Sequence, residues 1–290
     1  RTQPRDAYRP ARPVMIAPPR GGGIIGIAPM LRQTYLHIPG IGPGAERALW
    51  AAGHSDWAQA LAAARAGRLG RALAARLERH LPAAEAALAA GDARPFLPLA
   101  RYGECWRLYD GFARRCLYLD IETNGAAGTE EEITLVGVSD GRRYHAFLAE
   151  ENLGELPDWL EAAEAQVLVT FNGAGFDVPA LRRRWRRCPL PSAHIDLRYA
   201  AAKAGLKGGL KRLEPQLGLE RPAAVAGLDG WDAVRLWWAW RNDGDQEARE
   251  RLIAYNRCDV MNLIPLLAEV HGRLARERVG SRGVGAGACG

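Results

Sequence analysis

The hydrophobic and polar pattern of the chain changes character near residue 98. From about residue 31 to 98 the sequence is rich in Ala, Leu and Arg, a composition that favours helices. Pro95 and Pro98 interrupt this region. Beyond them, short apolar runs separated by polar and turn-forming residues are typical of strands. The pattern therefore predicts a helical N-terminal region followed by a region that contains a β-sheet.

The strand-like runs define the expected order of the sheet-containing region. They lie at 116–121, 133–139, 144–148 and 167–171, with a possible fifth at 194–197. The first three follow one another closely, which predicts an antiparallel meander. A helical stretch near 156–165 then reads as a crossover to the fourth run, and helical patterns follow from 176 onward. The fold class predicted is α/β, a mixed sheet flanked by helices, behind a small all-α domain.

Four segments are expected along the 290 residues: a basic, disordered leader at 1–30, a helical domain at 31–98, the sheet-containing domain at 105–275, and a flexible tail at 276–290. The run Gly21-Gly22-Gly23 lacks the G-K-[ST] ending of a phosphate-binding loop and is interpreted as a linker.

Composition narrows the functional class. Hydrophobic residues make up 48% and charged residues 25%, as in ordinary globular proteins, and no window approaches the roughly 20 apolar residues of a membrane span. A net charge of +6 suits a polyanionic partner such as nucleic acid, although arginine also rises in high-GC genomes. The five scattered cysteines contain no C-x-x-C pair, which argues against a zinc site and fits a reducing, cytoplasmic location.

Asp120 and Glu122 are the most informative residues of the chain. They end the apolar run Cys116-Leu117-Tyr118-Leu119, and a strand period of two places both carboxylates on one face. Two neighbouring carboxylates repel each other and resist burial, and a divalent cation between them relieves both problems. A solvated strand end is the alternative interpretation.

Two further elements carry acidic residues. Asn172 and Asp177 follow the fourth run, with glycines at 173 and 175 that permit a tight turn, and Asp177 stands where the next helix should begin. Alternatively, Asp177 is a helix N-cap and Asn172 a turn residue. Tyr255 and Asp259 are four apart in a predicted helix at 246–264, so they share one face, unless Asp259 is simply exposed. Pro265 should kink or end this helix.

Taken together, these elements resemble the three motifs of DEDD-type exonucleases of the ribonuclease H-like superfamily. The matching residues are D-I-E-T at 120–123, N-x-x-x-F-D ending at Asp177, and Y-x-x-x-D at 255–259, the subtype with tyrosine. The stretches 194–197, 209–214 and 231–234 also look like an uncharacterised bacterial branch of the superfamily. The resemblance covers roughly residues 105–272.

The resemblance implies a 3′→5′ exonuclease that uses two Mg²⁺ or Mn²⁺ ions. Asp120 would bridge both ions, Glu122 and Asp259 would complete the first site, and Asp177 would hold the second. Tyr255 would orient the attacking water rather than act as a base, because its free pKa is about 10.

The helical region contains a second motif. Ile38-Pro39-Gly40-Ile41-Gly42 and the residues after it resemble a helix-hairpin-helix segment, whose backbone N–H groups at Gly40, Ile41 and Gly42 would bind phosphate. A plain αα-hairpin is the alternative. Other candidate nucleic-acid contacts are Asn172, Arg182, Arg183 and Lys211. Four tryptophans at 231, 237, 238 and 240 suit a core-facing stripe better than a base-stacking surface.

The sequence therefore predicts a metal-dependent nuclease acting on DNA or RNA, with single-stranded ends as the expected substrate. A structure-selective endonuclease of the same superfamily and an inactive nucleic-acid-binding factor are the alternatives. The complete set of four carboxylates with Tyr255 argues against the inactive factor.

Overall fold

The computed structural model describes residues 30–126, 128 and 132–283. The predicted leader, apart from Met30, and the glycine run at 21–23 lie outside the described residues, as does the end of the predicted tail.

A five-stranded mixed sheet forms the centre of the molecule, with the strand order β3-β2-β1-β4-β5. Its strands are β1 (Cys116–Thr123), β2 (Ile133–Ser139), β3 (Tyr144–Leu148), β4 (Val167–Thr170) and β5 (Ala193–Asp196). β1 pairs antiparallel with β2 and β2 with β3, whereas β4 lies parallel to β1 and β5 parallel to β4. The predicted meander, the crossover and the mixed α/β sheet are confirmed.

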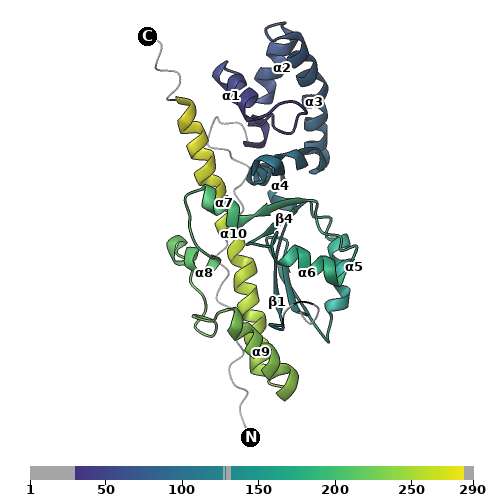
Figure 1. The fold of residues 1–290 in the computed structure, drawn as a ribbon, viewed down its shortest axis with the longest axis vertical. Helices are drawn as coiled ribbons and strands as arrows, with labels where there is room; N and C mark the ends of the chain where they lie inside the picture. Colours follow the sequence, from purple (N-terminus) through teal and green to yellow (C-terminus); the bar gives the residue numbers. More distant parts are fainter. Residues whose placement is uncertain (1–29, 127, 129–131, 284–290) are drawn as a thin grey trace.

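Helices cover both faces of the sheet (Figure 1). Leu117, Leu119 and Ile121 of β1 pack in the same cluster as residues of α5 (Leu156–Ala162) and α6 (Asp177–Arg184). The alternate residues Cys116 and Tyr118 pack in the cluster that contains the apolar residues of α10 (Gln246–Gly283). Because side chains alternate along a strand, Asp120 and Glu122 continue this second face, toward α10.

The N-terminal part consists of η1 (Met30–Gln33), α1 (Pro43–Ala51), α2 (Trp57–Arg65), α3 (Arg71–Ala90) and η2 (Arg94–Tyr102). The short elements η3 (Cys105–Leu108), α4 (Tyr109–Phe112) and η4 (Ala113–Arg115) lead into β1. The remaining elements are η6 (Leu153–Glu155), α7 (Leu197–Lys203), α8 (Leu210–Leu213), η7 (Pro215–Leu217) and α9 (Gly230–Asp243).

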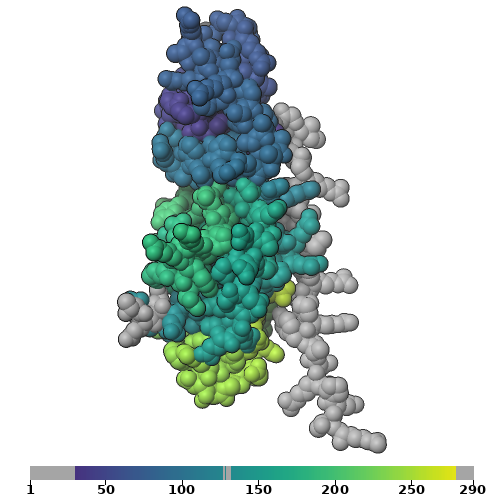
Figure 2. Space-filling view, turned by 90° about the vertical axis from the view of Figure 1, so that its right-hand side faces the viewer, coloured from purple at the N-terminus to yellow at the C-terminus, as the bar shows by residue number. Residues whose placement is uncertain are grey.

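The helical part and the sheet share one hydrophobic core. Trp57 and Phe96 of the helical part belong to the same buried cluster as Tyr118 of β1 and Leu267 of α10. In the space-filling view the N-terminal helices sit directly on the sheet half of the molecule (Figure 2). The two parts are therefore held together by core packing, which fixes their relative placement.

Helix α10 differs from its prediction at the C-terminal end. It does not end near Pro265 but continues to Gly283, so residues 276–283 are helical where a flexible tail was expected. Beyond the proline, Leu266, Leu267, Val270 and Leu274 are buried in the shared core. Burial of several leucine-sized side chains, each worth about 1.5–3 kcal/mol, outweighs the roughly 3 kcal/mol cost of an interior proline.

Candidate active site

Three carboxylates meet on the α10 side of β1. One oxygen each of Asp120, Glu122 and Asp259 lies within 4.8 Å of the others. Glu122 and Asp259 are buried, whereas Asp120 is partly exposed. Asp120 and Glu122 lie on this face because side chains alternate along a strand, and Asp259 joins them because α10 packs across the same face. The structure thus brings together three of the four predicted ligands in one tight group.

Asp177 lies next to this group but outside it. It is the first residue of α6, and its carboxylate accepts a hydrogen bond from the backbone N–H of Ile121 at 3.1 Å. Ile121 stands between Asp120 and Glu122 in the chain. The Asp177 side chain is therefore directed at β1. The N-cap of α6 is Phe176, so the alternative interpretation of Asp177 as a helix N-cap is wrong.

The loop that carries Asp177 is anchored by Asp196 at the end of β5. The Asp196 carboxylate accepts hydrogen bonds from the N–H groups of Asn172 at 2.8 Å and Ala174 at 3.0 Å. Asn172 has φ +68° and its side chain accepts from Arg198, so it acts as a turn residue here. A Cβ on Gly173 would lie 2.3 Å from Thr170 Oγ1, so the loop requires glycine at that position. Nucleic-acid contact by Asn172 stays a prediction.

Asn256 joins the two carboxylates of β1. Its side chain is fully buried, and its Nδ2 donates to Asp120 Oδ2 at 3.0 Å and to Glu122 Oε1 at 3.2 Å. Its Oδ1 accepts from the Tyr144 hydroxyl at 2.9 Å. A Cβ on Gly137, which pairs with Asp120 across β1 and β2, would lie 1.8 Å from that same oxygen. Gly137 therefore makes room for Asn256.

Two cations flank Tyr255 and Asp259. Lys211 donates a hydrogen bond to the Tyr255 hydroxyl and lies 4.4 Å from the centre of its ring. Arg221 binds both oxygens of Glu214, at 2.8 and 2.6 Å, and also contacts Asp259. The structure thus places the predicted nucleic-acid contact Lys211 beside the predicted catalytic tyrosine. Arg221 and Glu214 were not anticipated from the sequence, since Arg221 reaches Asp259 and Glu214 reaches Asn262 only through the packing of α10.

Burial raises the pKa values of all four carboxyl groups, and repulsion between them adds to the rise for Asp120, Glu122 and Asp177. Burial is the main cause for Asp120, whose pKa lies well above its ordinary value, followed by the charges of Asp259, Asp177 and Glu122. Burial and Asp259 raise the pKa of Glu122 to about 8, and burial raises that of Asp177 to about 7. Burial likewise raises the pKa of Asp259, although Arg221 opposes it.

The excess of carboxylates over cations at this site suits the binding of divalent cations. Lys211 and Arg221 offset only part of the negative charge of four carboxylates, and the ligand atoms available are hard oxygens. Burial, followed by the charge of Asp259, also raises the pKa of Tyr255, so its hydroxyl keeps its proton at neutral pH. Tyr255 is therefore suited to orient a bound group and not to remove a proton.

The other predicted nucleic-acid contacts lie in varied settings. Arg182 and Arg183 are exposed on α6. Gly40, with φ +81°, accepts from Arg76 through its carbonyl, Ile41 is buried in the shared core, and Gly42 precedes α1 as its N-cap. The segment before α1 is the 3-10 helix η1 and a turn. Phosphate binding by these residues stays a prediction.

The expected core stripe of tryptophans is only partly present. Trp237 is buried and Trp240 packs against the same cluster, but Trp231 is 64% exposed and Trp238 36% exposed. Trp237 shares its buried face with Ala233, four residues away, whereas the side chain of Trp231 leaves the helix in another direction. The core interpretation is therefore wrong for Trp231 and Trp238.

Comparison with known proteins identifies the family. No curated protein matches the chain. Among solved structures, the chain is similar to the family B DNA polymerase of the hyperthermophilic archaeon Pyrobaculum calidifontis, with 21% sequence identity and a TM-score of 0.43. That similarity covers 53% of this chain and 24% of the polymerase chain. No helix within the described residues has the length and apolar character needed to cross a membrane. The model of the RNase_H superfamily matches residues 117–271, a range that holds the whole acidic cluster, and the chain belongs to that superfamily.

Proposed function

We propose that the protein is a metal-dependent nuclease that hydrolyses phosphodiester bonds, and specifically a 3′→5′ exonuclease that uses two divalent cations. The observation that carries the proposal is the convergence of Asp120, Glu122 and Asp259 within 4.8 Å on an RNase H-like sheet. Membership of the superfamily together with this cluster supports a nuclease. The direction of digestion rests on the resemblance of the three motifs to DEDD-type exonucleases.

Each carboxylate has an assigned place in the proposal. Asp120, Glu122 and Asp259 would hold one Mg²⁺ or Mn²⁺ ion, and Asp177, with Asp120, would hold the second. Bound divalent cations supply an activated water and offset the charge that develops on the phosphate. Asn256 holds Asp120 and Glu122 in fixed orientations by donating to both, so the ligands are preorganised.

Tyr255 and Lys211 form a hydrogen-bonded pair that would contact the attacking water and the phosphate. The Tyr255 hydroxyl accepts from Lys211, which leaves its own proton free to donate to the attacking water or to a phosphate oxygen. Lys211 adds a positive charge on the same side of the site, where it would attract the phosphate. Arg221 keeps Asp259 in place through its link to Glu214.

The test is a cleavage assay on oligonucleotides labelled at either end, as DNA and as RNA, with Mg²⁺ or Mn²⁺. We expect products that shorten from the 3′ end. In the Asp120→Asn variant the rate should fall by roughly a thousandfold, because a metal ion supplies several kcal/mol of transition-state stabilisation. Equal cleavage by the variant would show a contaminating nuclease and refute the proposal, whereas internal cuts would favour the endonuclease alternative.

A further inference from the structure

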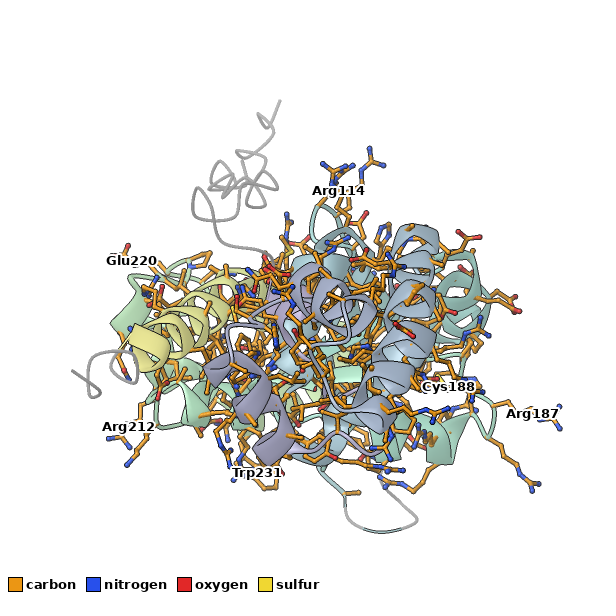
Figure 3. All side chains as sticks on the ribbon, turned by 90° about the horizontal axis from the view of Figure 1, so that it is seen from above. Arg114, Arg187, Cys188, Arg212, Glu220 and Trp231 are labelled. Atoms are coloured by element: carbon orange, nitrogen blue, oxygen red, sulfur yellow. The ribbon has the colours of Figure 1, made fainter. Side chains whose placement is uncertain are left out.

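The exposed indole of Trp231 stands beside the strand that carries the metal ligands. Trp231 lies in the first turn of α9, and that turn is fixed by a capping box between Asp229 and Asp232. The side chain is 64% exposed, and its outward position is visible at the margin of the molecule in Figure 3. Its backbone is thus held rigidly while its ring faces solvent.

Two contacts join α9 to the residues that directly follow β1. Trp238 donates from its indole N–H to the backbone oxygen of Asn124 at 3.2 Å. Gly125, with φ +77°, approaches so closely that a Cβ there would lie 3.3 Å from the Trp231 ring and 3.0 Å from Val234. Gly125 is three residues past Glu122, a stretch that spans at most about 10 Å. The Trp231 ring therefore packs beside the turn that leads away from Glu122, on the part of the chain that follows the acidic strand β1.

We propose that Trp231 is a stacking platform for an unpaired nucleobase of the strand whose phosphodiester bond lies at the acidic cluster. The inference rests on the proposed nuclease function and extends it to single-stranded substrate. A nucleobase offers a flat apolar face that matches an exposed indole, and such stacking contributes about 1–3 kcal/mol per base. A base that is paired within a duplex has no free face to offer unless it leaves the stack.

Binding is measured in the Asp120→Asn background, so that it does not depend on cleavage. Fluorescence anisotropy with a labelled single-stranded 12-residue oligonucleotide, as DNA and as RNA, compares Trp231→Ala with Trp231→Phe. We expect Kd to rise roughly tenfold for the alanine variant and much less for phenylalanine, which keeps an aromatic face. Tyr102→Ala, which removes an exposed aromatic residue of η2, is the control and should leave Kd unchanged.

A second measurement separates stacking from a general loss of affinity. Single abasic sites are placed in turn along the oligonucleotide. With Trp231 present, one position should show a clear loss of affinity, and Trp231→Ala should abolish the loss at that position. If Trp231→Ala leaves Kd unchanged, or weakens intact and abasic strands equally at every position, the proposal is refuted. Both results stand whether or not the wild-type protein cleaves, so they are independent of the cleavage assay.

Discussion

Two buried clusters of charged residues occupy different parts of this molecule, and their balance of charge is opposite. One is the acidic cluster, the close group of Asp120, Glu122 and Asp259 with Asp177 beside it. The other, here the interface network, joins Glu46 of α1 and Glu104 to Arg107, Lys203 and Arg278. Both are formed by residues distant in sequence. The first has more carboxylates than cations, whereas the second has cations enough for both of its carboxylates.

The pKa values of the carboxyl groups reflect this difference in charge balance between the two clusters. Burial alone would raise the pKa of Glu104, but Arg107, Lys203 and Arg278 together bring it below its ordinary value. In the acidic cluster burial raises every carboxyl pKa, and the nearby carboxylates add to this rise for Asp120, Glu122 and Asp177, while Arg221 and Lys211 only partly oppose it at Asp259. In a paired network each buried charge already has its partner, whereas an unbalanced network gains stability from an added cation. This comparison supports a structural role for the interface network and the proposed metal-binding role for the acidic cluster.

The largest effect is expected from breaking the interface network. The Arg107 side chain is fully buried between Glu46, at 3.1 Å, and Glu104, at 2.6 Å. Replacing it in Arg107→Met leaves a carboxylate buried without its main partner, which costs roughly 3–5 kcal/mol of unfolding free energy. Denaturant unfolding measures the loss. Arg94→Met removes an exposed ion pair with Asp92 and should have no measurable effect, and equal behaviour of both variants would contradict the comparison.

The acidic cluster should respond in the opposite direction. Asp120→Asn removes one of the mutually repelling carboxylates, so the variant without divalent cations should melt at a higher temperature than the wild type. Adding Mn²⁺ at about 100 times its Kd should stabilise the wild type by about 2.7 kcal/mol and the variant far less. Thermal melting with and without the ion measures both. Asp92→Asn, outside the cluster, should keep the full wild-type shift.

A smaller effect is expected from the amide that organises the cluster. Asn256→Ala removes the hydrogen bonds to Asp120 and Glu122 and should weaken Mn²⁺ affinity by roughly 10–100-fold, as loss of a ligand-orienting group does. Titration calorimetry measures the affinity.

Gly137→Ala provides an independent route to the same change, because its Cβ would displace the Asn256 side chain. Gly154→Ala is the matched control, since nothing lies within 4 Å of the Cβ it would add. Normal metal affinity in Gly137→Ala would show that Asn256 does not hold the ligands.

The positions of some site residues could be predicted from the sequence, because they depend only on the local period of a strand or helix. The strand period placed Asp120 and Glu122 on one face, and the helix period placed Tyr255 and Asp259 together. Asn256 was not recognised, although an amide three residues before Asp259 in a buried helix is a usable signal. Arg221, Glu214 and the anchoring role of Asp196 depend on contacts across the fold that no local pattern encodes. Pro265 misled the prediction because tertiary packing of the last turns of α10 outweighs its local cost.

The last prediction concerns His37, a buried titratable group that belongs to neither cluster. We expect its replacement to have the smallest effect on stability. It lies between Trp57 and Phe96, at ring distances of 5.1 and 5.2 Å, and neither ring nitrogen has a hydrogen-bond partner among the described residues. Burial, with a contribution from His80, lowers its pKa to about 3. Above about pH 6.5 the ring is neutral in both folded and unfolded states, so it costs nothing through protonation there.

As the pH falls below 6.5 the unfolded state binds a proton that the folded state refuses until about pH 3, so stability is lost across that window. At pH 5 the loss should be roughly 2 kcal/mol. His37→Phe keeps an apolar ring in the cluster and should match or exceed wild-type stability at pH 7.5 while falling less by pH 5. Urea unfolding at both pH values tests this. If the free energy of unfolding falls equally in the two proteins between pH 7.5 and pH 5, His37 has a hydrogen-bond partner in solution. His37 would then not differ from the paired groups of the interface network.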